Sequence, residues 1–553
     1  MKEVIVDFLA NHLKIDKEKI SSTIEIPPDS SLGDYAFPCF VLAKELKKSP
    51  VSISQELSVE LSKKIPKEIS GIKANGPYLN FFLDKKIFVE SVVNQILKEK
   101  EKFGCCEIGR GKKALIEHTS LNPNSDPHVG RMRNSLIGDC LANVMDFHGF
   151  KVERRYYVND VSKQVAMLVL NCSGKEKFSD LLKKYVEISR EVEKNPELEK
   201  EVFSLLEKFE KNDSETRKKF RKIVEIAVGG QKEILEKLGI KFDKFDYESD
   251  YIKSASEVLK RLEKSGRLFT DEENRKVLDE SGFGLEQKMK SPVLVLARSD
   301  RTGLYPLRDI AYTLDKLKKA GKNIIVLGED QKLYFEQIKT ALKILGHDAP
   351  EVVHYSYVLI KTNKGIEKMS TRKGELVLLS DFMKESHDKA LKEIKKRKTK
   401  GNPEKIGNAA VKFSILKNDP RKNILFDWES ALNFEGESGP YLQYSYARAS
   451  SILRKSKARI SKVKVISLND KEIELAKKLL EFKDIVKQVY YKSDPSLLAN
   501  YSFQLSKVFN EFYQSCPVLE SKERNQRLGI VEAFRIIQGL SLKLLGIDAL
   551  EEM

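Results

Sequence analysis

Residues 114–158 read ALIEHTSLNPNSDPHVGRMRNSLIGDCLANVMDFHGFKVERRYYV. ALIEHTS is a short apolar run of the kind that forms a buried strand, and the polar loop LNPNSDP follows it. The next apolar residues recur at helical spacing, and KVERRYYV reads as a second strand. Strand, loop, helix and strand in this order predict a parallel sheet with a right-handed crossover. Ligands of such sheets bind at the carboxyl ends of the strands, so we expect a functional crevice there.

The same pattern resumes near residue 292. The runs PVLVLAR, LYPLRDIAYTLDKLKKAG and NIIVLGED each combine an apolar stretch with a helix or turn, and we expect them to complete the sheet. A charged stretch at about 165–290 separates the two parts and is expected to form a mainly helical insertion. The fold class is therefore α/β, with a Rossmann-type parallel sheet in a domain at 112–400.

Two smaller domains flank this one. Residues 1–84 combine helices with short strands and end in ANGPYLNFFL, where Asn75-Gly76-Pro77 supplies a turn, so we expect a small α+β domain. We expect residues 85–111 to form a linker. Residues 401–553 read as amphipathic helices with no convincing strand, which predicts an all-α helical bundle.

The composition is that of a globular protein. The chain has 553 residues, of which 41% are hydrophobic and 33% charged, and this excludes a disordered or fibrous protein. The net charge of +17 favours a polyanionic partner such as nucleic acid, with a solvated basic surface as the alternative. No apolar run reaches the roughly 18 residues that span a bilayer, so we expect no membrane partner.

The cysteines and the N-terminal segment indicate whether a structural metal site is expected and in which cellular compartment the protein works. The six cysteines form no C-x-x-C pair, and no His stands at a zinc-ligand spacing, so we expect no structural metal and a reduced cytoplasm. The opening MKEVIVDFLANHLKI interrupts its apolar residues with charge and reads as the first helix of the fold, unlike a signal peptide.

Two short tracts carry the strongest signals for chemistry. Pro127-His128-Val129-Gly130-Arg131 stands at the start of the predicted helix, where backbone amides and the helix dipole favour anions. Gly130 would let an adenine ring lie against the backbone, and His128 would donate to phosphate oxygens. The tract Glu367–Glu375 holds three cations in six positions and can fold over a triphosphate. Taken singly, each tract has a plainer interpretation, a structural histidine and a solvated basic loop.

Together the two tracts resemble the HIGH and KMSKS signatures of class I aminoacyl-tRNA synthetases, in the expected order and about 240 residues apart. Two positions depart from the signatures: Arg131 stands in place of His, and Thr371 in place of the second lysine. The resemblance implies that ATP is bound by Pro127, His128, Gly130, Arg131, Lys368, Met369 and Ser370. It implies that the reacting phosphates are stabilised by His128, Arg131, Lys368, Arg372 and Lys373.

Several other stretches resemble the arginyl-tRNA synthetases, over nearly the whole chain. IEHTSLNPNSDPHVGRMRNS resembles that family's first strand and signature, YPLRD and VLGEDQ its amino-acid pocket, ANGPYLNFFL its N-terminal domain, and ESGPYLQYSYARASSIL with LLGIDALEEM its anticodon-binding bundle. The resemblance implies an arginine-tRNA ligase that activates L-arginine with Mg-ATP and transfers it to the 3′-terminal adenosine of tRNA(Arg). It also implies that activation depends on tRNA. The expected partners are tRNA(Arg), L-arginine and ATP with Mg²⁺ as substrate, for a cytoplasmic monomer.

The resemblance also implies an arginine pocket. Glu117, Tyr305 and Asp309 would line the guanidinium site, and Ser120, Asn122 and Gln331 would hold the α-amino and carboxylate groups. The chemistry agrees, because a planar cation with five donors is matched by carboxylates placed for bidentate contact. The alternatives are that Asp309 pairs with neighbouring Arg308 and that Glu117 is an exposed charge at the end of a strand.

Contacts with tRNA are implied for two regions. Asn75, Tyr78 and Asn80 match the family's contact with the tRNA elbow, where an aromatic face and amides can read an unstacked base. A turn Asn and a core Tyr are the alternative. In the C-terminal domain, Tyr441, Gln443, Tyr444 and Arg448 interleave aromatic and polar groups, as suits a surface that stacks anticodon bases. Tyr444 reads equally well as a core residue.

Two other functions stay open on the sequence alone. A class I synthetase for another amino acid, such as cysteine or lysine, would carry both signatures, although the cysteine enzyme would want a zinc site. A catalytically silent tRNA-binding paralogue would explain the departures at Arg131 and Thr371.

Overall fold

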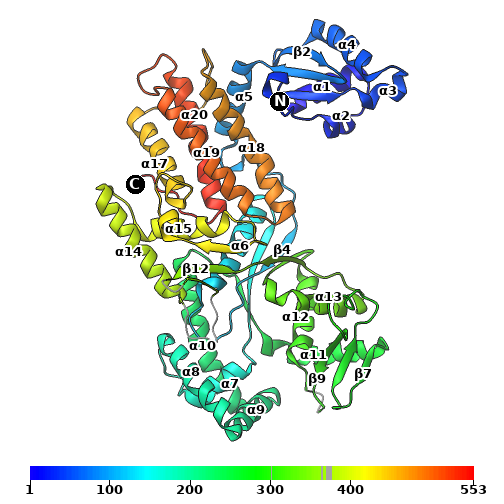
Figure 1. Cartoon of the computed structure of the whole chain (residues 1–553), viewed down its shortest axis with the longest axis vertical. Helices are drawn as coiled ribbons and strands as arrows, with labels where there is room; N and C mark the ends of the chain where they lie inside the picture. The colour runs from blue at the N-terminus through cyan, green and yellow to red at the C-terminus, as the bar shows by residue number, and fades with distance from the viewer. Residues whose placement is uncertain (300–301, 363–364, 369–376) are drawn as a thin grey trace. The chain divides into compact units, whose positions relative to one another are not determined.

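The computed structural model describes residues 1–299, 302–362, 365–368 and 377–553 (Figure 1). The chain forms two compact units. The first contains residues 1–103, 449–482 and 507–537, and the second contains residues 104–448, 483–506 and 538–553. Each unit is therefore assembled from segments that lie far apart in the sequence.

The first unit begins with the predicted small α+β domain. Its three strands form an antiparallel sheet in the order β1-β3-β2. The elements are α1 (Lys2–Leu13), α2 (Lys17–Thr23), β1 (Tyr35–Pro38), α3 (Phe40–Leu46), α4 (Pro50–Leu61), β2 (Ile69–Asn75), β3 (Tyr78–Leu83) and α5 (Lys85–Glu99). Asp16, Ser49 and Asp84 cap α2, α4 and α5, because each side chain accepts a backbone N–H in the first turn.

The core of the second unit is a five-stranded parallel sheet, which confirms the predicted α/β fold. Its order is β11-β10-β4-β5-β6. The strands are β4 (Lys113–Glu117), β5 (Lys151–Val158), β6 (Lys244–Tyr247), β10 (Lys322–Gly328) and β11 (Glu351–Tyr355). The helices beside them are α6 (Val129–Phe147), α12 (Tyr305–Lys319) and α13 (Lys332–Ile344). In the middle strand, Leu115 and Ile116 are both fully buried, as a strand covered on both faces requires.

The run PVLVLAR does not join this sheet, and the sequence prediction is wrong there. It forms β9 (Val293–Ala297), which lies in a separate antiparallel sheet with β8 (Lys276–Asp279) and β7 (Leu268–Thr270). Leu294 and Leu296 are buried, whereas the valines beside them are partly exposed. This alternation is typical of a sheet with one covered face, whereas a central parallel strand is buried on both.

The segment between β5 and β9 is mainly helical. Its helices are α7 (Lys163–Asn171), α8 (Phe178–Lys194), α9 (Pro196–Glu210), α10 (Ser214–Lys237) and α11 (Ile252–Lys264). Helices α7 to α10 pack on one another as a group (Figure 1). Helix α8 buries Leu181, Ile188 and Val192 along one stripe. The other faces of an amphipathic helix meet solvent, which is why its remaining residues can be charged.

The C-terminal part of the chain adds a small sheet and more helices. The strands β12 (Val358–Thr362), β13 (Gly365–Lys368) and β14 (Ile424–Phe426) pair in the order β13-β12-β14. The sequence did not predict β14, because a strand of three residues shows no period. The helices are α14 (Leu379–Arg397), α15 (Pro403–Leu416), α16 (Trp428–Ala431), α17 (Gly439–Ser456), α18 (Asp470–Lys492), α19 (Ser496–Ser515) and α20 (Arg524–Leu544). From α17 onward the regular elements are all helices, which confirms the predicted all-α bundle, whereas β14 lies inside the range 401–553 in which the sequence predicted no strand.

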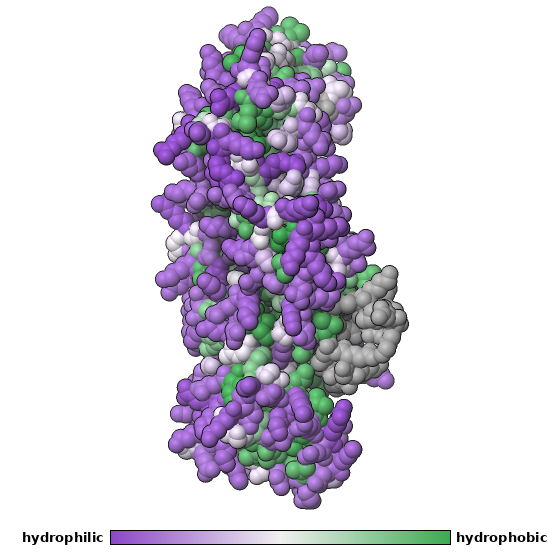
Figure 2. Space-filling view, turned by 90° about the vertical axis from the view of Figure 1, so that its left-hand side faces the viewer, coloured by the Kyte–Doolittle hydropathy of each residue, from purple (hydrophilic) through white to green (hydrophobic). Residues whose placement is uncertain are grey.

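One face of the molecule is mostly polar (Figure 2). Figure 2 shows hydrophilic side chains over most of the face in view, with apolar residues in small scattered patches. Within the described residues, no helix is long and apolar enough to cross a membrane.

Candidate active site

The candidate site begins with a sharp turn after β4, at the strand end where the sequence predicts a crevice. Thr119 and Ser120 have φ angles of 75° and 42°, a left-handed backbone that is costly for residues other than glycine. The turn is held from two sides. The Thr119 amide donates to Asn134 Oδ1 on α6 at 2.7 Å, and the Tyr157 amide on β5 donates to Ser120 Oγ at 3.3 Å. The loop that carries the first signature therefore starts from a fixed position.

His128 immediately precedes α6 and rests against Gly130. A Cβ added at Gly130 would lie 3.0 Å from two ring atoms of His128, so a larger residue would displace the imidazole. Burial and, to a smaller extent, the charge of Arg131 lower the pKa of His128 to about 4. The imidazole is therefore neutral at neutral pH and keeps one N–H to donate.

A short antiparallel pairing joins the two signatures. Residues 126–129 run beside residues 377–380, and the Leu379 amide donates to the Pro127 carbonyl at 2.7 Å. Residues 377–380 directly follow the second signature. Most of that signature, namely Met369, Ser370, Thr371, Arg372 and Lys373, lies outside the described residues. Lys368 ends β13, where its backbone pairs with Leu359. The pairing thus anchors the chain that leaves the second signature against the first.

Arg131 occupies the place of the signature's last histidine, in the first turn of α6. Burial works against charge on its guanidinium, but Tyr355 and Asp330 outweigh that effect and hold the pKa of Arg131 above its ordinary value. Arg131 is therefore cationic at every physiological pH and suited to a phosphate.

Asp309 is the carboxylate best suited to a cationic substrate. It lies on α12, and the Tyr334 hydroxyl on α13 donates to its Oδ2 at 2.9 Å. Burial raises the pKa of Asp309 to about 6, an effect that Lys316 partly opposes. In the part of the chain that the structure describes, no cationic group lies within ion-pairing distance of Asp309. A desolvated carboxylate without a counter-ion is costly, so this position favours a bound cation.

Arg308 precedes Asp309 but has other partners. Its Nε donates to Glu248 at 2.6 Å, and its Nη1 lies 3.4 Å from Glu210. The alternative that Arg308 neutralises Asp309 is therefore wrong. Consecutive helical residues point about 100° apart, which sends the two side chains into different networks.

Glu117 ends β4 and is 7% exposed, so the alternative of an exposed strand-end charge is also wrong. It forms an ion pair with Lys316, which is itself 1% exposed. The Lys316 ammonium lies 4.1 Å from the ring centre of Tyr312. Two carboxylates were predicted to bind the guanidinium. Glu117 already forms an ion pair with Lys316, whereas Asp309 forms none with the described residues.

The other predicted pocket residues lie around the same strand ends. Tyr305, one helical turn before Asp309, is 52% exposed, and its ring centre lies 5.0 Å from that of Tyr334. Ser120 and exposed Asn122 follow β4, and Gln331 ends the short helical turn after β10. Tyr334 thus connects Tyr305 to Asp309.

Sequence reasoning missed two tyrosines at this site. Tyr334 stands three residues after Gln331, in the first turn of the next helix, so its distance from a predicted pocket residue was the available signal. Tyr157 stands at the carboxyl end of the predicted strand KVERRYYV, which is where ligands of a parallel sheet bind.

In the first unit, the predicted elbow-contact residues lie on the β2-β3 hairpin. Asn75 is exposed and pairs with partly buried Tyr78 across the turn. The rings of Tyr78 and Phe40 meet edge to face, with their centres 6.1 Å apart. Asn80 is 4% exposed, which is the burial expected of a residue inside the domain.

The predicted anticodon residues in the second unit lie on α17. The Arg448 guanidinium lies 4.7 Å from the ring centre of Tyr444 and donates to its hydroxyl at 3.0 Å. The ring centre of Tyr441 lies 5.6 Å from that of Phe503. Gln443 is fully buried, and its amide donates to the Asp548 carbonyl at 2.8 Å. We therefore do not propose Gln443 as a contact with tRNA.

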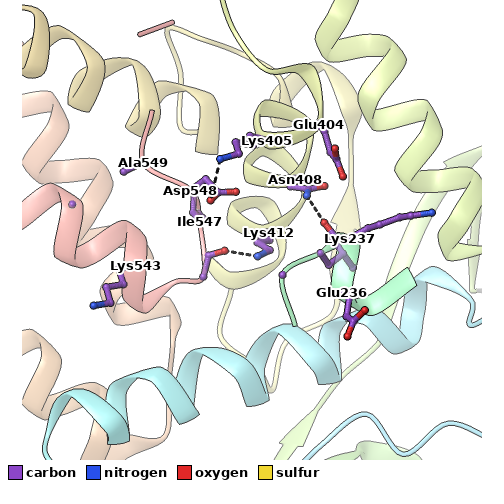
Figure 3. Close-up of a pocket in the computed structure, with 14 residues that line it drawn as sticks. Glu236, Lys237, Glu404, Lys405, Asn408, Lys412, Lys543, Ile547, Asp548 and Ala549 are labelled. Atoms are coloured by element: carbon purple, nitrogen blue, oxygen red, sulfur yellow. Dashed lines mark hydrogen bonds and ion pairs between the residues drawn. The ribbon is translucent and has the colours of Figure 1, made fainter. Parts of the chain in front are cut away.

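A cavity of about 510 Å³ lies elsewhere in the second unit, between the end of α10, α15 and the C-terminal segment (Figure 3). Lys412 on α15 donates to the Gly546 carbonyl, and Asn408 donates to the Lys237 carbonyl at 2.7 Å. None of the predicted site residues lines this cavity. The hydrogen bond from Lys412 to Gly546 holds the C-terminal segment against α15.

The described residues contain no group of three or more His, Cys, Asp or Glu placed to hold a metal ion. The six cysteines form no disulfide.

Three known families match successive parts of the chain. Residues 1–83 match the arginyl tRNA synthetase N terminal domain, residues 92–428 the catalytic domain of class I (R) tRNA synthetases, and residues 442–553 the DALR anticodon binding domain. Together the matches extend over almost the whole sequence.

Full-length relatives agree with these matches. The chain is 37% identical to an arginine-tRNA ligase of Methanocaldococcus jannaschii, over 99% of this chain and 97% of that protein. It is 33% identical to one from Clostridium botulinum, over the full length of both. Among solved structures, an arginyl-tRNA synthetase of Thermus thermophilus matches with a TM-score of 0.80 and 27% identity, covering both chains completely.

Proposed function

This chain belongs to the arginyl-tRNA synthetase family, and from that premise we infer that it is an arginine-tRNA ligase whose amino-acid pocket is centred on Asp309. The observation that carries the pocket assignment is charge balance. Glu117 pairs with Lys316, and Glu248 pairs with Arg308. Asp309 has no such internal cation among the described residues, and the guanidinium of the substrate arginine would be its partner.

The identity of the amino acid follows from geometry as well as charge. A guanidinium carries five N–H donors in a plane, so it can satisfy a carboxylate and still reach other acceptors. Lysine offers a compact ammonium with three donors and cannot fill the same planar site. Tyr305 and Tyr334 would border the stem of the substrate beside Asp309, as their 5.0 Å ring contact allows.

ATP is the second substrate of this class of enzyme, and we propose that it enters as Mg-ATP. We assign its binding to Pro127, His128, Gly130, Arg131, Lys368, Met369 and Ser370. The start of α6 supports this assignment, because the Gly130 amide has no acceptor among the described residues and the helix dipole favours an anion. We assign Ser120, Asn122 and Gln331 to the α-amino and carboxylate ends of arginine.

The proposed reaction has two steps. The arginine carboxylate attacks the α-phosphorus of ATP, the bond to the bridging oxygen breaks, and pyrophosphate leaves. The terminal ribose hydroxyl of tRNA then attacks the carbonyl carbon of the adenylate, loses its proton and releases AMP. Neutral His128 and cationic Arg131 would stabilise the charge that develops on the phosphate, with help from Lys368, Arg372 and Lys373. The protein acts mainly by positioning groups and balancing charge.

We propose that tRNA contacts two surfaces, which are assigned separately. Asn75 and Tyr78 at the hairpin tip would read the elbow, with Asn80 supporting them from inside the domain. Tyr441, Tyr444 and Arg448 on α17 would contact the anticodon loop. The stacked Arg448 and Tyr444 support this, because such a pair presents a cation and an aromatic face together.

Pyrophosphate exchange with each amino acid, measured with and without tRNA(Arg), tests the function. We expect exchange with arginine alone among the amino acids, and only when tRNA is present. Exchange with another amino acid would identify a different class I specificity. No exchange under any condition, with tRNA still bound, would identify a silent paralogue.

A further inference from the structure

Tyr157 has a hydroxyl group that the fold itself does not use. The oxygen is buried, and it has no hydrogen-bond partner among the residues that the structure describes. A desolvated hydroxyl without a partner costs free energy, and native proteins rarely keep one without a use. The neighbouring tyrosine on β5 shows the usual arrangement, because the Tyr156 hydroxyl donates to Gln231 at 2.8 Å.

The position of Tyr157 is fixed by its ring and its backbone. The ring stacks on that of Tyr312, with centres 4.4 Å apart and planes 13° apart. Its amide donates to Ser120 Oγ at the left-handed turn after β4. The hydroxyl therefore occupies a defined place at the carboxyl ends of β4 and β5.

The charges that act on this hydroxyl include both carboxylates of the proposed arginine pocket. Burial raises the pKa of Tyr157 well above its ordinary value; Glu248, Asp309 and Glu117 raise it further, whereas Arg308 lowers it. Tyr157 thus stays protonated, within electrostatic range of Asp309 and Glu117 of the proposed pocket and of the Glu248–Arg308 ion pair. A phenol in this setting can donate to a carboxylate while its oxygen accepts from an N–H donor.

We propose that Tyr157 is a substrate-binding residue whose hydroxyl oxygen accepts a guanidinium N–H of arginine. This assignment rests on the proposed arginine pocket. It adds a hydrogen-bond acceptor for a guanidinium N–H that the carboxylates do not bind. Asp309 occupies one edge of the guanidinium plane, and Tyr157 takes an N–H that Asp309 leaves unpaired. A lysine ammonium is a compact point charge and not a planar fork, so it matches this pair of acceptors less well, and Tyr157 also contributes to selection against lysine.

Tyr157→Phe tests the proposal, since it removes the hydroxyl and keeps the stacked ring. We expect the KM for arginine to rise at least tenfold, equivalent to ~1.4 kcal/mol, with the KM for ATP within threefold of wild type. The melting temperature of the arginine-free protein should not fall, because the hydroxyl has no partner to lose. The shift of that temperature on adding arginine should shrink, which reports binding without catalysis.

Tyr251→Phe is the matched control in the same aromatic cluster. The Tyr251 ring centre lies 5.0 Å from that of Tyr312, but its hydroxyl donates to Asp315 at 3.1 Å. This variant should lower the melting temperature and leave the KM for arginine unchanged. An unchanged KM in Tyr157→Phe, or a loss of stability like that of the control, would overturn the proposal. If the wild type charges no arginine at all, the proposed function fails first, and the two failures are thus distinguished.

Discussion

Arg308 and Asp309 are consecutive on helix α12, yet Arg308 bonds Glu248 at 2.6 Å while Asp309 accepts a hydrogen bond from Tyr334 at 2.9 Å. The acidic pocket is therefore not neutralised by the cation beside it in the sequence. The first two predictions follow from this separation.

Asp309→Asn should raise the KM for arginine by roughly 30-fold or more, because removing one partner of a buried charge pair costs about 2 to 5 kcal/mol. The KM for ATP should stay within threefold. The asparagine oxygen can still accept the Tyr334 hydroxyl, and no internal ion pair is lost, so the melting temperature should not fall. Steady-state kinetics and a melting curve give both results.

Asp315→Asn is the control on the same helix. Asp315 accepts from Tyr251 and pairs with Lys319, so this change should lower the melting temperature and leave the arginine constants alone. If Asp309→Asn behaves like Asp315→Asn, the pocket is wrongly placed.

The use of arginine should depend on pH through Asp309. Its pKa of about 6 in the free protein means that the carboxyl gains a proton, and loses its charge, as the pH falls below about 6. Arginine stays cationic throughout, so kcat/KM for arginine should fall about tenfold for each further pH unit.

The same shift predicts the effect of pH on stability. The folded pKa lies above the unfolded value of 3.8, so charging Asp309 disfavours the fold as pH rises toward 6. Asp309→Asn should flatten both profiles between pH 5 and 7. A wild-type kcat/KM that is constant over this range would exclude Asp309 as the group that binds the guanidinium.

His128→Ala should lower the aminoacylation rate by about 10² and leave the Kd for tRNA unchanged, because one preorganised donor to a developing oxyanion is worth about 3 kcal/mol. The pKa of His128 is about 4, so the wild-type rate should show no loss from its protonation above pH 5. His387→Ala changes a surface histidine on α14 beside Asp388 and should have no effect. Rapid-quench measurements of adenylate formation give the rate directly, and a near-normal rate in His128→Ala would contradict the nucleotide assignment.

The cations of the second signature should be partly redundant. Single alanine substitutions of Lys368, Arg372 and Lys373 should each reduce the exchange rate less than the triple substitution does, since neighbouring cations can share one anionic ligand. Thr371→Lys should change the rate little. A sharp gain from Thr371→Lys would mean that the natural loop lacks a needed cation.

The sequence predicted what depends on local pattern. The spacing of apolar residues in 114–158 predicted strands β4 and β5 and helix α6. The first signature marked the start of that helix, where His128 lies. The position of β9 was missed, because an apolar run of five residues does not reveal whether one face or both are covered. The contacts of the pocket were also out of reach. Asp309 meets Tyr334 only because α12 and α13 pack on the same sheet, and no spacing in the sequence reports that a hydroxyl such as that of Tyr157 has no internal partner.

The anchoring of the C-terminal segment by Lys412 has a consequence for how the protein is made. Residues 538–553 belong to the same compact unit as the parallel sheet, and the Lys412 ammonium, 4% exposed, donates to the Gly546 carbonyl. During synthesis the sheet emerges from the ribosome first, while the acceptor for this buried amine is more than a hundred residues from being translated. A nascent chain that already carries both signatures therefore cannot give Lys412 this carbonyl acceptor until residues 538–553 have been translated. A chain that stopped before residue 538 would carry all five strands of the parallel sheet but lack the segment that accepts this hydrogen bond from α15.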